Sequence, residues 1–333
     1  MYLGEDTVTN EAPVAKTALD TGKHPIPSAF RIWLFPFTRI HRIPVFKRVW
    51  LYLAVMAMYG AGVDWITDHE LRAAQVFKEI GAAAYTSVIL GLLLVFRTNS
   101  AYERWWEGRK LWGQLVNESR NMCLKVKILV GASKADRNRF GELLISFAYG
   151  LKHHLRDSRP TKNVHGVDLD PTANIPVAMA GELYKMMMKW QNEGIIDGFT
   201  RLQLDAHIKT LMDITGSCER IRSAPLAVSY RAFLRQGIAL QLLALPWFVP
   251  PDVPYIFSMP ILLIGSYFLI GLELIAEDIE DPFGEDGDDL PLDYICDKIQ
   301  ATITEILELP KQRFTAAFKA PKLDPLKATE SPK

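Results

Sequence analysis

The sequence lacks an excess of charge of either sign, since 38 Lys and Arg residues balance 38 Asp and Glu residues over 333 positions. A basic surplus is typical of proteins that bind nucleic acid, so nothing here favours that class of partner. Cysteine is also scarce, and Cys123, Cys218 and Cys296 lie far apart without a CxxC pair. This spacing predicts neither a zinc site nor a disulfide framework and indicates free thiols in a reducing compartment.

The motifs of common enzyme classes are missing as well. The adjacent His153 and His154 lack the HExxH spacing of zinc hydrolases and would point to different faces of a helix. Neither a GxSxG motif nor a phosphate-binding P-loop occurs. A membrane-bound, metal-dependent enzyme acting on a lipid or polyprenyl substrate stays open as an alternative, although a second acidic cluster for such chemistry is not found. We predict that the protein is not an enzyme.

Hydrophobic residues make up 49% of the chain and gather in four runs. A helix needs about 20 apolar residues to cross a bilayer, so each run is a candidate membrane span. Basic residues before the first run and after the second predict a multi-pass protein of the cell membrane with both termini in the cytosol. The four candidate spans cover about 49–66, 77–96, 232–250 and 255–276.

The remaining sequence is polar and indicates a second, water-facing half. We expect an all-α integral membrane protein whose four spanning helices extend into a cytosolic helical domain, together covering 29–309. Cytosolic helices are expected at about 97–231 and 292–309 because apolar residues there follow helical spacing. Flexible tails are expected at 1–28 and 310–333.

The chain is organised around residues 80–113, which turn from apolar to polar without any helix breaker. A continuous helix that changes solvent partway along is the simplest interpretation. Val88, Leu92 and Phe96 recur every fourth residue, and each step turns about 40° beyond a full turn, so they share one narrow face. Copies of this helix around an axis would form a hydrophobic constriction that gates by dewetting. Alternatively, the three side chains pack against lipid or a neighbouring helix.

Two charged features stand out beside this stretch. Glu273 lies in an apolar run, where an ionisable group is costly and is usually paired or faces water. Arg97 and Arg104 are its candidate partners, although either could instead extend to the membrane interface. Eight acidic residues between 277 and 289 surround Gly284 and Gly287. Such a run could wrap a calcium ion, which takes oxygen ligands from a flexible loop, or could form a solvated turn.

Three separated motifs stand out in the sequence: FRTNSAYERWWEGRKLWG at Phe96–Gly113, GSCERIRSAPLAVSY at Gly216–Tyr230 and EDIEDPFGEDGDDLPLD at Glu277–Asp293. They resemble, in the same order, segments of bestrophin-type ion channels, and the similarity spans about 30–309. The short tails suggest a prokaryotic member of that family. The resemblance implies a ring-shaped homopentamer with the second spanning helix of each subunit along the axis.

The resemblance also implies roles for single residues. Val88, Leu92 and Phe96 match the neck of the pore, and Phe199 falls where the family has a second, cytosolic aperture. Without the resemblance, Phe199 would be interpreted as a core anchor.

Calcium-regulated bestrophins suggest ligands in the acidic run. Asp286 and Asp289 match side-chain ligands, and Asp281 matches a backbone ligand. Asp278 departs from the pattern, since it replaces a neutral amide, and Gly287 interrupts the acidic run. Calcium is therefore a candidate ligand, and no cofactor is required.

We expect passive conduction of small monovalent ions, with chloride favoured. A monovalent-cation channel of the same fold is the alternative within this class, and a non-conducting membrane scaffold is a third hypothesis. The expected partners are copies of the chain itself, monovalent ions and membrane lipids.

Overall fold

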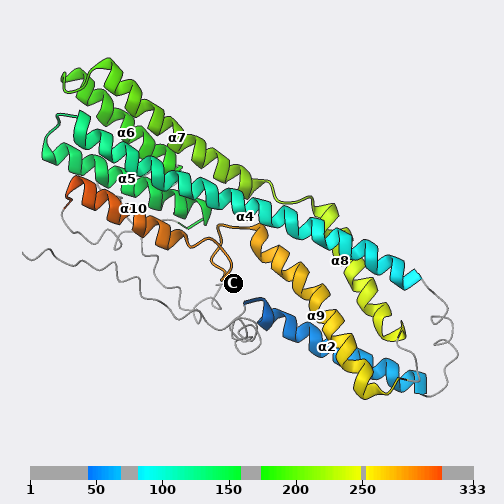
Figure 1. Cartoon of the computed structure of the whole chain (residues 1–333). Coiled ribbons are helices and arrows are strands. Elements are labelled where there is room, and N and C mark those ends of the chain that lie inside the picture. Colours follow the sequence, from blue (N-terminus) through cyan, green and yellow to red (C-terminus); the bar gives the residue numbers. More distant parts are fainter. Residues whose placement is uncertain (1–43, 69–81, 159–173, 249–252, 310–333) are drawn as a thin grey trace, which may run out of the picture. The chain divides into compact units, whose positions relative to one another are not determined.

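The computed structural model describes residues 44–68, 82–158, 174–248 and 253–309 (Figure 1). The expected tails at 1–28 and 310–333, and the start of the second candidate span at 77–81, lie outside these residues. Within the described ranges every regular element is a helix, as expected. The helices are α2 (Pro44–Asp68), α4 (Ala82–Leu129), α5 (Lys134–Leu155), α6 (Ile175–Asn192), α7 (Gly198–Ser223), α8 (Val228–Ala244), α9 (Tyr255–Glu280) and α10 (Leu292–Leu307), with a 3-10 turn η2 (Leu245–Phe248) after α8.

Helix α4 is the element that the other helices share. Its 48 residues run without a break through the apolar and the polar sequence, which confirms the continuous helix expected there. At 1.5 Å per residue it is about 72 Å long. One part contacts α8 and α9, and another contacts α5, α7 and α10, as the cyan helix in Figure 1 shows. The apolar and polar halves of the protein are therefore joined through a single rigid rod.

The polar half has a conventional hydrophobic core around α5. Almost every side chain of α5 from Phe140 onward is buried against α4, α6, α7 and α10. Gly141 allows α10 to approach closely, because a Cβ at this position would lie 2.8 Å from Leu307 Cδ1. Helix starts are set locally: Ser133 Oγ accepts from the Asp136 amide at 3.1 Å, and Asp197 Oδ1 accepts from the Thr200 amide at 2.8 Å.

The apolar half consists of α2, α8, α9 and the first part of α4. Helix α9 packs along both α2 and α4, and α8 packs against α4. Among the described residues, Arg48–Ile66 and Tyr255–Glu280 are long and apolar enough to cross a membrane by length and composition. Many large apolar side chains of this half are exposed in the single chain, including Ile256 and Phe257 on α9. Such a surface requires lipid or another protein chain to cover it.

The third candidate span differs from its expected form. The sequence predicts one segment over 232–250, but α8 begins earlier, at Val228, and its α-helical hydrogen bonding ends at Ala244. Pro246 lies in the 3-10 turn that follows. Proline has no backbone N–H to donate and clashes with the preceding turn of an α-helix, which explains the early end. Residues 249 and 250 lie outside the described ranges.

Candidate functional site

The three residues of the expected neck lie on an exposed face of α4. Val88, Leu92 and Phe96 are 72%, 56% and 55% exposed in the single chain. Their intervening neighbours Leu90 and Leu94 are buried. Helix α4 therefore has one apolar face that is packed within the chain and another that is free to meet a second chain or the axis of an assembly.

The packed face of α4 is fixed against α8. Leu90 and Leu94 form a small core with Leu234 and Ile238 of that helix. Tyr230 adds a polar contact, since its hydroxyl donates to the Leu93 carbonyl at 3.1 Å. These contacts determine which side of α4 is left exposed.

Arg97 follows Phe96 directly, and its side chain is fully buried. Its Nη2 lies 2.7 Å from Glu280 Oε2, and its Nε lies 3.6 Å from Glu273 Oε2. Both carboxylates are buried on α9. They are seven residues apart, so two turns of α9 place them on the same face. A buried charge is tolerated when it is paired, and Arg97 supplies the pairing for both.

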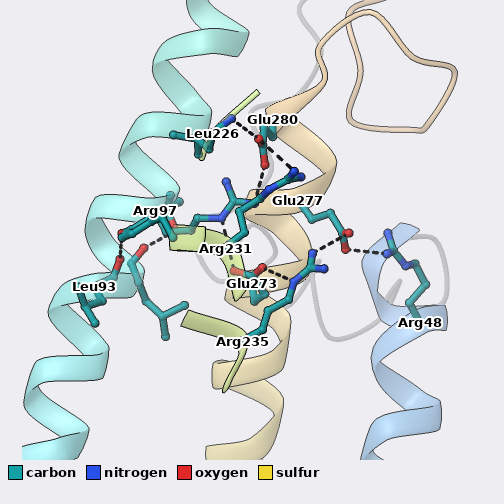
Figure 2. A network of polar contacts seen from close by, with 12 residues as sticks. Arg48, Leu93, Arg97, Leu226, Arg231, Arg235, Glu273, Glu277 and Glu280 are labelled. Carbon is teal, nitrogen blue, oxygen red and sulfur yellow. Dashed lines mark hydrogen bonds and ion pairs between the residues drawn. The ribbon is translucent and has the colours of Figure 1, made fainter. Parts of the chain in front are cut away.

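Glu273, Glu277 and Glu280 form what we call the acidic stripe of α9, and arginines from three other helices bind it (Figure 2). Arg235 of α8 contacts Glu273 through Nε at 3.0 Å and Glu277 through Nη2 at 2.7 Å. Arg48 of α2 contacts Glu277 through Nη2 at 2.9 Å. With Arg97 from α4, the stripe connects all four helices of the apolar half.

Arg104 was the other candidate partner for Glu273, but the structure gives it a different role. Its guanidinium donates to three carbonyl oxygens, at 3.1 Å to Glu280, 2.5 Å to Ala224 and 2.5 Å to Ile221. The last carbonyls of a helix have no partner within the helix. Arg104 therefore satisfies the ends of α7 and α9 and ties both to α4.

The acidic segment after α9 is folded against α4 instead of extending into solvent. Phe283 and Leu290 are buried, and a Cβ on Gly108 of α4 would lie 3.2 Å from the Phe283 ring. Trp105 of α4 donates from its Nε1 to the Asp288 carbonyl at 3.1 Å. The segment thus meets α4 on the turns that follow Arg104.

Asp286 and Asp289, the expected side-chain ligands of calcium, lie close to each other in this segment. Within the described part of the chain, no group of three or more His, Cys, Asp or Glu side chains is placed to hold a metal ion. Asp281, which is expected to contribute only its backbone oxygen, has an exposed side chain. Asp289 Oδ2 instead accepts from the Asp286 amide at 2.6 Å. Asp278, which departs from the calcium-binding pattern, contacts Arg48 at 2.5 Å. The described side chains form no ready-made calcium site, and calcium binding stays a prediction.

Asp289 nevertheless has an unusual environment. Its Oδ1 is buried without a hydrogen-bond partner. Partial burial, together with the nearby charges of Asp286 and Asp281, raises its pKa to about 6, although the hydrogen bond from the Asp286 amide opposes this shift. A neutral Asp289 is therefore favoured below that pH.

Phe199 is the second residue of α7, which begins at Gly198 after the N-cap Asp197. Its side chain is 78% exposed, so it is not the core anchor that the residue alone would suggest. Its role as a cytosolic aperture stays a prediction.

Sequence reasoning missed most of the acidic stripe and its arginines. Glu273 was recognised because it interrupts an apolar run, whereas Glu280 lies among other acids. Spacing was the usable signal, since Glu273, Glu277 and Glu280 share one helix face and Arg97 and Arg104 share another. Arg235 interrupts the third apolar run and carries the positive charge that pairs with Glu273 and Glu277.

The family model described as "Bacterial/Fungal Bestrophin protein" matches residues 27–305. A voltage-dependent anion channel-forming protein of Synechocystis is 33% identical over 235 residues, covering 67% of this chain and 76% of that protein. A Nostoc protein with the same description is 31% identical over 276 residues, covering 80% of this chain and 87% of that protein.

Solved structures agree on the fold. A bacterial bestrophin homologue from Klebsiella pneumoniae, crystallised with one substitution, superposes with a TM-score of 0.71 at 21% identity, covering 78% of this chain and 98% of that one. At this identity the comparison concerns the fold alone. The match of the family model over most of the chain shows that this protein belongs to the bacterial and fungal bestrophin family.

Proposed function

We propose that the protein is a membrane channel, assembled as a ring-shaped homopentamer, that conducts small monovalent ions passively. The observation that carries this proposal is the exposed apolar face of α4 formed by Val88, Leu92 and Phe96. In the described part of a single subunit this face is open, whereas symmetric copies would bring such faces together around one axis. The rings of Val, Leu and Phe would then form a narrow hydrophobic neck that can gate by dewetting.

The proposed path continues from the neck into the polar half, where Phe199 would form the cytosolic aperture. Helices α2 and α9 would cross the cell membrane together with α8 and the apolar half of α4, with both termini in the cytosol. The length and apolar composition of α2 and α9 support this topology. Lipid would cover the outward-facing apolar side chains, and the neighbouring subunits would cover the rest.

We propose that anions, and chloride among them, are favoured. The relatives from Synechocystis and Nostoc support this choice, because both are described as voltage-dependent anion channel-forming proteins. The neck side chains carry no charge, and the adjacent Arg97 is buried and paired with Glu280 and Glu273. Since no charged ring at the neck determines the sign of the ion, a cation-selective channel of the same fold is the alternative.

The test is purified protein in a planar bilayer with a tenfold KCl gradient. An ideally anion-selective channel shifts the reversal potential by about 59 mV toward the chloride potential, and an ideally cation-selective one shifts it equally toward the potassium potential. Native mass spectrometry of the same sample counts the subunits. Silence from intact rings, with and without added calcium, would reject the channel and leave a scaffold or a membrane enzyme. A monomer would equally argue against it.

A further inference from the structure

The charged residue beside the neck takes no direct part in the proposed path. Arg97 is fully buried on the side of α4 that faces α8 and α9, whereas the ring of Phe96 is exposed. Figure 2 shows its side chain extending from α4 toward Glu280 and Glu273 of α9. A fully desolvated arginine is costly to maintain, and here it is placed next to the last residue of the neck.

We propose that Arg97 is a positioning residue for the neck: held between Glu273 and Glu280, its guanidinium sets the rotation and depth of α4 and thereby places Phe96. The inference rests on the proposed function, in which Phe96 lines the path. It concerns how the neck is held, not which ion passes.

The two-point contact is what makes rotation costly. Glu273 and Glu280 lie about 10.5 Å apart along α9, because seven residues rise 1.5 Å each. The Arg97 guanidinium contacts both, at 3.6 and 2.7 Å. Any turn or slide of α4 carries this group away from at least one carboxylate and so weakens the pairing of a fully buried arginine. A one-residue change in helix rotation turns Phe96 by about 100°, off any common axis.

The carboxylates that hold Arg97 are themselves held in place. Arg235 of α8 contacts Glu273 at 3.0 Å, and the Leu226 amide before α8 donates to Glu280 at 2.9 Å. Arg48 of α2 and Arg235 both bind Glu277 in the middle of the acidic stripe. Helix α4 is therefore fixed to a frame of three helices, and that frame defines where the neck side chains lie.

The test removes the contact while keeping the buried charge balanced. Arg97→Met alone would leave the buried Glu280 with a single ion pair among the described residues, the 4.0 Å contact of Arg231. The main variant therefore combines Arg97→Met with Glu280→Gln and leaves Glu273 paired with Arg235. Arg109→Met is the matched control, because Arg109 lies on the same helix and is exposed. The unit conductance of each variant is measured by single-channel recording. In a second measurement Leu92→Cys is added to each variant, and the rate at which a methanethiosulfonate reagent modifies it is followed. The native cysteines are buried and should not contribute to this rate.

We expect the double variant to form rings of wild-type size, yet to change the unit conductance and the Leu92→Cys modification rate by about twofold or more, the range of moderate coupling energies. Arg109→Met should change neither. A double variant that matches wild type in both readouts would overturn the inference. If it does not assemble, Arg97→Lys, which keeps the charge but cannot bridge both carboxylates with a planar fork, is judged by the same criteria.

The two proposals can fail separately. A silent wild-type protein rejects the channel, but the modification rate needs no current and still shows whether Arg97 sets the exposure of position 92. A conducting wild type with an unchanged double variant rejects the role of Arg97 alone.

Discussion

Phe96 and Arg97 are neighbours in the chain with opposite environments: the Phe96 ring is more than half exposed, and the Arg97 side chain is inaccessible to solvent. One residue turns a helix by about 100°, so the two side chains leave α4 in different directions. The packed side of α4 carries the charge and the free side carries the apolar ring. This arrangement reverses the usual placement in a soluble protein and suits a helix whose free side meets other subunits or a narrow path.

Truncating the neck should widen it. We expect Phe96→Ala and Leu92→Ala to raise the unit conductance by about twofold or more, because each removes bulk from a hydrophobic constriction. Phe257→Ala is the matched control, since Phe257 is also exposed, at 64%, but lies on α9, outside the proposed neck. Currents that stay unchanged in both neck variants would show that these residues do not line the path.

The native cysteines should resist modification in the folded protein. Burial raises the pKa of Cys123 and of Cys218 to about 12 and raises that of Cys296 as well. The reactive thiolate is therefore almost absent at pH 8, and the sulfur atoms are inaccessible. Intact-mass spectrometry after thiol reagent treatment should show no adduct until denaturant is added. Rapid labelling without denaturant would contradict the packing of the polar half.

Removing Arg104 should destabilise the protein more than removing an exposed basic residue of the same helix. Arg104→Ala leaves the carbonyls of Ile221, Ala224 and Glu280 without this donor. Unsatisfied buried acceptors cost about 1–3 kcal/mol each when water cannot replace the donor, and partial solvation here reduces the total to about 2 kcal/mol. Thermal unfolding in detergent measures the loss, with the exposed Lys110→Ala as control. Equal melting temperatures for the two variants would rule out the capping role.

Asp289 should make stability depend on pH. Its folded pKa of about 6 lies above its ordinary value, so its contribution to stability is complete below that ordinary value and is lost as pH rises through about 6. Asp289→Asn should therefore raise the free energy of unfolding near pH 7.5 by about 1 kcal/mol, after allowance for solvent screening, and leave it nearly unchanged at acidic pH.

Asp288→Asn, in the same segment but exposed, is the control for this pH effect. If the free energy of unfolding of Asp289→Asn rises equally at both pH values, the pH dependence does not come from the ionisation of Asp289. Added calcium gives a second comparison: if it raises the melting temperature of wild type but not of Asp289→Asn, the segment rearranges to bind the ion.

Much of this architecture could be predicted from local patterns. The unbroken passage from apolar to polar sequence predicted α4, because no proline or turn signal interrupts it. Composition likewise predicted α2 and α9. Pro246 marks the end of α8, but the apolar residues continue beyond it, so hydrophobicity alone predicts a longer segment. A run of apolar residues therefore predicts whether a segment is surrounded by water or by lipid more reliably than it predicts where the α-helical hydrogen bonding ends.

The pairing of charges could not be predicted, for a physical reason. Arg97 and Arg104 lie seven residues apart on one face of α4, so helical spacing treats them alike. Their partners differ because of where α7 ends. The carbonyls at that end accept hydrogen bonds from Arg104, whereas Arg97 pairs with the carboxylates of α9. That choice depends on the packing of segments more than one hundred residues away, for which periodicity carries no information.

Because α4 is unbroken, the direction in which its neck side chains point is coupled to the direction in which its side chains enter the polar core. Phe96 and Trp112, which is fully buried in that core, are part of the same helix, so their directions cannot be adjusted independently. One residue inserted between them would turn one end by about 100° against the other, whereas seven would restore the phase to within about 20°. An insertion in this stretch is therefore expected to keep both the neck and the polar core intact only when its length is close to a whole multiple of two turns.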